Sequence, residues 1–247
     1  MSNIIKFIAR DEYGWETQNK PVPASSLVPQ WWKEITPYDI SFENLDGKKL
    51  IVENRAANAS FKKCTPMLDA ITSGYIVTLW ADVQVRQIYD EELNKYVPRV
   101  TWRTNDPWGM FTQHGVSSQK IPSPTGYSNI VFKYQNTWIP ITPLGYSVLI
   151  TSPFGHRDLP FHAIPAIIDS DKSQLEILPP MWIKDGFEGI VEEGTPLFQI
   201  TPFKRENWKA EFDFYTETQY KLIEDKNFNK TLVNHYIKKV WSKKSYK

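Results

Sequence analysis

The stretch that decides the fold runs from Thr142 to Pro202 and reads TPLGYSVLITSPFGHRDLPFHAIPAIIDSDKSQLEILPPMWIKDGFEGIVEEGTPLFQITP. Short apolar runs at 146–151, 166–169, 175–178 and 197–201 are separated by glycine, proline, serine and aspartate, which is typical of β-strands joined by tight turns. This spacing predicts an antiparallel barrel or sandwich, because parallel βαβ units need a helix between successive strands.

Further strands are expected on the N-terminal side of this stretch, at 4–10, 75–85, 96–103, 129–134 and 138–142. The polar residues 91–95 indicate a hairpin turn, and Pro98 in the return strand indicates a sheet edge, since proline cannot donate to a ladder. We expect Ser25 or Ser26 to cap a short helix through Trp31 and Trp32.

We expect three parts: an N-terminal arm with a short helix (1–60), a β-rich core domain (61–210) and a C-terminal helical tail (211–247). The fold class expected is therefore mainly β, with an N-terminal arm and a C-terminal α-helical segment. The 104–127 loop is long, and loops of that length tend to be functional or held by a partner.

The composition limits the classes of function. The formal net charge of +1 gives no global attraction to nucleic acid or anionic lipid, so we expect no sequence-specific nucleic-acid binding and no membrane association. A single cysteine, Cys64, suits a reducing compartment, and the N-terminus lacks the apolar core of a signal peptide. We expect a protein that is not secreted and acts in a cytoplasm. Eighteen prolines and ten tryptophans indicate short, rigidly connected strands with a dense core or an interface.

Three motifs of the deciding stretch resemble the β-clip fold of the dUTPase and dCTP deaminase superfamily. They are Gly145-Tyr146 leading to Thr151-Ser152-Pro153, then 166–171 (AIIDSD), then 194–199 (GTPLFQ). The resemblance implies a β-clip-like barrel or sandwich. It also implies a nucleotide pocket lined by Ser152, Asp169 and Gln199, with Asp169 orienting the attacking water and Mg²⁺ as cofactor.

The chain departs from that pattern where the chemistry is carried. Thr151 stands where the family has its phosphate-binding arginine, and Lys172 stands where it has a tyrosine. The glycine-rich closing arm has no counterpart, and positioning and charge neutralisation supply most of the rate of such an enzyme. A nucleotide-processing or nucleotide-binding enzyme is therefore the alternative reading, and our first hypothesis has no catalytic residue.

The whole chain also resembles a group of proteins of about this length encoded by tailed phages, notably cyanophages. The residues that carry this likeness are Cys64-Thr65-Pro66 followed by Ser73-Gly74-Tyr75, and Gly194-Thr195-Pro196 followed by 202–205 (PFKR). The resemblance implies action in the host cytoplasm or in the virion.

Two sets of polar residues suggest metal binding. His156 and Asp158, with His162 beyond them, have the types and spacing of a metal-ligand set, whereas turn hydrogen bonding is the simpler interpretation. Asp169 and Asp171 share a face if their segment is extended, which suggests a cation or general-base pair; the alternative is a polar strand terminus. We commit to no metal site.

Our first hypothesis is a non-enzymatic, oligomer-forming phage protein, structural or virion-associated, that acts through protein–protein contacts. Self-association and binding to other virion or phage proteins would use aromatic side chains at Trp31, Trp32, Trp108 and Trp241, because tryptophan buries a large area at interfaces. For Trp31 and Trp32 the simpler interpretation is that they cover the core of their own domain. Lys204, Arg205 and Lys209, and the lysines of the C-terminal tail, are interpreted as solvated, with sequence-independent phosphate contacts as the alternative.

Overall fold

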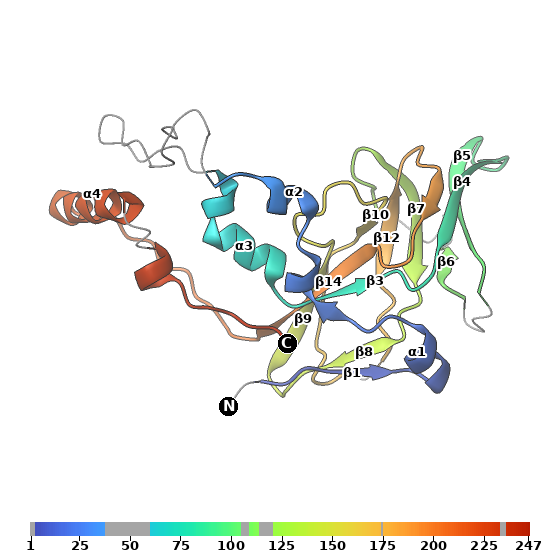
Figure 1. Cartoon of the computed structure of the whole chain (residues 1–247), viewed down its shortest axis with the longest axis horizontal. Coiled ribbons are helices and arrows are strands. Elements are labelled where there is room, and N and C mark those ends of the chain that lie inside the picture. Colours follow the sequence, from blue (N-terminus) through green and yellow to red (C-terminus); the bar gives the residue numbers. More distant parts are fainter. Residues whose placement is uncertain (1–2, 38–59, 105–108, 114–120, 174, 233–235) are drawn as a thin grey trace. The chain divides into compact units, whose positions relative to one another are not determined.

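The computed structural model describes residues 3–37, 60–104, 109–113, 121–173, 175–232 and 236–247. The chain forms two compact units (Figure 1). Unit 1 comprises residues 1–27, 73–205 and 246, and unit 2 comprises residues 28–72, 206–245 and 247. The predicted boundaries at residues 60 and 210 remain predictions, and the structure groups the first 27 residues with the β-rich unit.

Unit 1 contains all of the strands in the described part of the chain. Its strands are β1 (Lys6–Ala9), β2 (Val22–Pro23), β3 (Tyr75–Thr78), β4 (Val83–Asp90), β5 (Lys95–Trp102), β6 (Phe111–Gln113), β7 (Tyr127–Tyr134), β8 (Trp138–Ile141), β9 (Tyr146–Thr151), β10 (Phe161–Ala163), β11 (Ala166–Ile168), β12 (Pro180–Lys184), β13 (Gly189–Val191) and β14 (Pro196–Lys204). One α-helix, α1 (Glu12–Thr17), and a 3₁₀ turn, η1 (Ala24–Leu27), belong to the same unit.

The strands form four antiparallel sheets in the described part of the chain. Their orders are β11-β9-β14-β3-β2, β10-β12-β7-β6, β13-β4-β5 and β1-β8 (Figure 1). The mainly β class is confirmed, and so is the C-terminal helical segment. The sheets keep open edges, so the described residues do not form the closed barrel that was one of the two expected architectures.

A single hydrophobic core lies between the sheets of unit 1, and it explains the strand patterns. Val83 and Val85 of β4 point into it while Arg86 is exposed, which is the alternation expected of a strand with one wet face. β14 is central in its sheet, and its Leu197, Phe198 and Ile200 are all completely buried.

Gly74 fixes the start of β3 against β14. Its φ is +67°, and a Cβ at this position would lie 2.1 Å from the Ile200 carbonyl oxygen. The position therefore requires glycine for both backbone conformation and space. Its carbonyl accepts from the Ala24 amide at 3.0 Å, which ties the N-terminal residues to the sheet.

The predicted hairpin is confirmed as β4 and β5, which pair over their whole length from Val83 opposite Trp102 to Asp90 opposite Lys95. β5 is an edge strand, as Pro98 indicated. The expected strand at 75–85 is two strands, β3 and β4, which belong to different sheets. The strand expected at 175–178 is wrong, since the chain is irregular there and the strand begins at Pro180.

The N-terminal residues pair within the chain. β1 pairs with β8 and β2 pairs with β3, so this part of the predicted arm adds strands to two sheets of unit 1. Asp11 caps α1 by accepting from the Gly14 amide at 2.7 Å.

Unit 2 contains α2 (Gln30–Glu34), the 3₁₀ turn η3 (Phe61–Lys63), α3 (Thr65–Thr72), α4 (Glu217–Leu232) and the π-helical turn η5 (Tyr236–Val240). The helix expected at Trp31 and Trp32 is confirmed as α2. Its predicted serine cap is wrong, because Pro29 precedes the helix and provides no side-chain cap. In the part of the chain that the structure describes, no helix combines the length and apolarity needed to cross a membrane.

Candidate functional site: an exposed aromatic segment

Two of the three residues expected to line a nucleotide pocket are engaged by neighbouring backbone. The Gln199 side chain is completely buried; its Oε1 accepts from the Phe154 amide at 2.9 Å, and its Nε2 donates to the Ser73 carbonyl at 2.6 Å. The Ser152 hydroxyl accepts from the Ala163 amide at 2.9 Å. Gln199 therefore connects segments that lie 45 and 126 positions away from it, and Ser152 bonds to a residue 11 positions away.

The third residue, Asp169, belongs to a charged cluster around Arg205. The guanidinium donates to both carboxylate oxygens of Asp171, at 2.8 Å for the first, and lies 3.1 Å from Asp169 Oδ1. The Ser147 hydroxyl donates to Asp169 at 2.7 Å and, ahead of the charge of Arg205, lowers the pKa of that carboxyl.

Asp171 is held more tightly than Asp169. The hydrogen bond from Arg205 lowers the pKa of Asp171 from 3.8 to about 2, and the amide of Gly145 adds a bond of 2.8 Å. Arginine forms its strongest pairs in such bidentate geometry. The guanidinium of Arg205 thus lies between the carboxylates of Asp169 and Asp171 and pairs with both. The interpretation of Arg205 as a solvated cation is therefore wrong, because its charge is used within unit 1.

The structure does not bring the three predicted pocket residues together. Gln199 lies opposite Thr151 at one end of β9, whereas Asp169 bonds to Ser147 near the other end. Ser147 and Thr151 are four positions apart along β9, which corresponds to about 13 Å at the usual rise per residue of a strand.

The histidine set is also dispersed. His156 Nε2 lies 2.9 Å from the Leu27 carbonyl oxygen, and burial lowers the pKa of this imidazole. Asp158 is exposed, while the His162 ring contacts the rings of Tyr127 and Trp182, with centroid distances of 5.2 and 6.1 Å. Among the residues that can be described, no three side chains of histidine, cysteine, aspartate or glutamate are grouped as metal ligands.

The four tryptophans assigned to an interface have different environments. Trp32 is buried within unit 2, with the Lys62 ammonium 5.9 Å from its ring centre, and Trp31 is half-buried beside it. Trp241 is half-buried, and its indole nitrogen donates to Asp69 of α3 at 2.9 Å. Trp108 lies outside the described residues.

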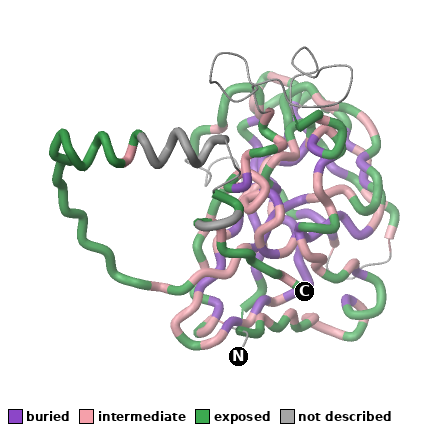
Figure 2. The backbone as a smooth tube through the Cα atoms, turned by 60° about the vertical axis from the view of Figure 1, so that its left-hand side comes forward, coloured by how far each residue is buried: buried purple, intermediate pink, exposed green. Residues whose placement is uncertain are grey.

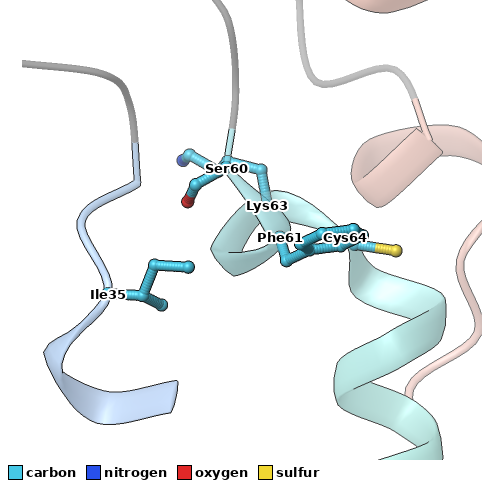
Figure 3. Close-up of a pocket in the computed structure, with 5 residues that line it drawn as sticks. All are labelled: Ile35, Ser60, Phe61, Lys63 and Cys64. Carbon is cyan, nitrogen blue, oxygen red and sulfur yellow. The ribbon is translucent and has the colours of Figure 1, made fainter. Parts of the chain in front are cut away.

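Unit 2 also contains a pocket of about 490 Å³ lined by Ile35, Ser60, Phe61, Lys63 and Cys64. Figure 3 shows Ile35, just after α2, facing the turn that carries Phe61 and Cys64. Both lining segments continue into residues 38–59, which lie outside the described part of the chain. The lining is therefore incomplete, and it assigns no ligand.

The most unusual surface is one that the sequence analysis did not select: residues 207–215, which we call the aromatic segment. It has no helix or strand, and every one of its residues is exposed. Figure 2 shows the exposed colouring continuing along the backbone from β14 toward α4. Trp208, Phe212 and Phe214 are exposed to 87, 96 and 84%. Soluble monomers rarely present contiguous apolar surface of this kind, which marks interaction sites.

The aromatic segment has the pattern of a half-buried strand. Trp208, Ala210, Phe212 and Phe214 alternate with Lys209, Glu211 and Asp213, so one face of an extended chain is apolar and the other charged. No backbone-to-backbone hydrogen bond joins residues 207–215 to any other described residue. The alternation of apolar and charged residues is visible in the sequence, whereas the interpretation given above used only Trp208 and its basic neighbours.

Comparisons with known proteins assign no relative to the chain. No protein-family model, curated protein or solved structure matches it.

Proposed function

We propose that this chain is a non-enzymatic, oligomer-forming protein, structural or virion-associated in a phage, that acts through protein–protein contacts. The observation that carries the proposal is the aromatic segment, an exposed strand-patterned stretch without a partner strand in the described chain. The β-clip-like ancestry of unit 1 remains part of the proposal.

The energetics favour a protein partner for this surface. Burying each of the three large aromatic side chains is worth about 2 kcal/mol, or about 6 kcal/mol together. If these side chains stayed in water, they would promote non-specific association. In a specific interface, the free energy gained by burying them offsets the entropy lost when two chains associate, and the remainder is the affinity.

Light scattering on size-exclusion eluates tests the proposal. We expect the wild-type chain to elute above the monomer mass of 28.8 kDa at tens of micromolar, and the double variant Phe212→Ser/Phe214→Ser to elute at that mass. The matched control is Leu144→Ser/Ile167→Ser, which removes two apolar side chains of unit 1 that are 85 and 65% exposed. It should keep the wild-type mass. A monomeric wild type would contradict the proposal.

The nucleotide-processing alternative is tested separately by calorimetry with a panel of deoxynucleoside triphosphates and Mg²⁺. Ser152, Asp169 and Gln199 are all engaged internally, so we expect no heat of binding. Micromolar binding that is abolished by Asp169→Asn would favour the enzyme instead.

A further inference from the structure

β5 is the longest edge strand in the described sheets, at eight residues. One cross-strand residue pair shows which backbone groups of β5 point away from β4. Gln87 and Pro98 lie opposite each other, yet the Gln87 amide donates to Glu188 on the far side of β4 at 2.8 Å, and proline has no amide hydrogen. Gln87 and Pro98 are therefore a non-hydrogen-bonded pair of the β4–β5 ladder. Such pairs alternate with hydrogen-bonded pairs along two antiparallel strands. The backbone polar groups that point away from β4 are therefore those of Tyr96, Pro98, Val100 and Trp102.

That outer edge is unpaired in the described part of the chain. The amides of Tyr96, Val100 and Trp102 have no backbone acceptor there, and sheet edges of this length are templates for another strand. Pro98 removes one donor from the edge, which leaves three amides and four carbonyls.

The two faces of β5 differ in chemistry. Tyr96, Pro98, Val100 and Trp102 form an apolar face, and Tyr96 is 67% exposed. The opposite face has Lys95, the buried Val97, Arg99 and Thr101, with Arg103 next in the same direction.

Arg99 lies opposite Arg86 of β4, and both are exposed. Neither has a side-chain partner among the described residues, and like charges placed directly across a sheet destabilise it. The nearby groove of about 770 Å³ is lined by Arg86 and Arg103 and also by the acidic residues Asp82 and Glu193, and it does not include Arg99. It is the cross-strand pair of Arg86 and Arg99 that favours an acidic neighbour.

The aromatic segment matches the apolar face of β5 and can place a carboxylate opposite Arg99 on the other face. In an antiparallel strand added to β5 with Glu211 opposite Arg99, the apolar residues 208, 210, 212 and 214 fall opposite 102, 100, 98 and 96. Trp208 then meets Trp102, and Phe214 meets Tyr96. Asp213 falls opposite Val97 and lies diagonally between Lys95 and Arg99, within reach of long side chains, whereas Lys209 falls opposite Thr101, diagonally between Arg99 and Arg103.

We propose that the aromatic segment of one copy pairs as an added antiparallel strand with the β5 edge of a second copy of this chain, with Glu211 beside Arg99. The inference rests on the proposed function and names its partner surface. Backbone hydrogen bonds supply affinity in such strand addition, and the alternating side chains supply the register.

Charge reversal across the proposed pair tests the contact. We expect R99E alone and E211R alone each to weaken self-association about tenfold in sedimentation velocity, because each places like charges opposite each other. An equimolar mixture of the two variants should associate as strongly as wild type, since every contact between unlike copies then has opposite charges. Lys184→Glu, an exposed lysine on β12, is the control and should change nothing.

The outcomes separate the two proposals. A monomeric wild-type chain overturns both. A wild-type oligomer that is unaffected by R99E and E211R keeps the proposed function and overturns this contact, and so does a mixture that fails to regain association. Recovery of self-association in the mixture also excludes docking of the aromatic segment onto β5 of its own chain. In that arrangement each variant would still have like charges at positions 99 and 211, and adding the other variant would not change this contact.

Discussion

Replacing Gln199 by methionine separates a structural role from a ligand-binding one. The side chain is completely buried and makes hydrogen bonds to the Phe154 amide at 2.9 Å, the Ser73 carbonyl at 2.6 Å and the Ser73 hydroxyl at 3.2 Å. Methionine has nearly the same length but removes all three. At about 1 kcal/mol for each lost bond, the free energy of unfolding should fall by about 3 kcal/mol.

The assay is urea unfolding followed by tryptophan fluorescence, at sub-micromolar protein so that association contributes little to stability. The matched control is Gln84→Met on β4, a half-buried glutamine whose side chain has no hydrogen bond within the described residues. It should cost less than 0.5 kcal/mol. If the Gln199→Met protein were as stable as wild type, the reasoning would be refuted, because the wild-type Gln199 amide would then not be needed for the fold and would be free to bind a ligand.

Two further predictions concern unit 1. Gly74→Ala should lower the free energy of unfolding by about 3 kcal/mol, because the new Cβ would clash with Ile200 and the backbone conformation would be strained. The control is Gly186→Ala, which has the same φ of +67° but open space around it and should cost about 1 kcal/mol. Equal losses for the two variants in chemical denaturation would contradict the close approach of Gly74 to Ile200. Because the pKa of Asp171 is lowered to about 2, its ionised form stabilises the fold above about pH 4, and that contribution is lost as pH falls toward 2. Asp171→Asn should flatten this part of the stability–pH curve, and an unchanged acid limb would show that the pair with Arg205 is not formed.

Local patterns predicted much of the sheet structure. The β4–β5 hairpin follows from its polar turn and alternation, and Pro98 identified the edge because proline cannot occupy an interior ladder position. The strand predicted at 175–178 is wrong because the prediction gave more weight to the apolar residues there than to Pro179 and Pro180, which follow them. Proline is tolerated as the first residue of a strand, and β12 begins at Pro180.

The candidate site was less predictable for a physical reason. Gln199 is satisfied by Ser73, 126 positions away, and Asp171 by Arg205, 34 positions away. Such long-range partners are not encoded in local spacing, so residues that resemble a nucleotide pocket in sequence act as connections between segments. The aromatic segment did carry a local signal, but only its exposure in the folded chain distinguishes it from an ordinary core strand.

Hydrogen–deuterium exchange of the peptide spanning residues 207–215 is the most direct test of whether another chain covers this segment. We predict that its amides exchange slowly at high protein concentration and within seconds after dilution, because strand pairing between copies is lost as the oligomer dissociates. Exchange within seconds at every concentration, in a sample whose mass exceeds that of the monomer, would contradict the central claim.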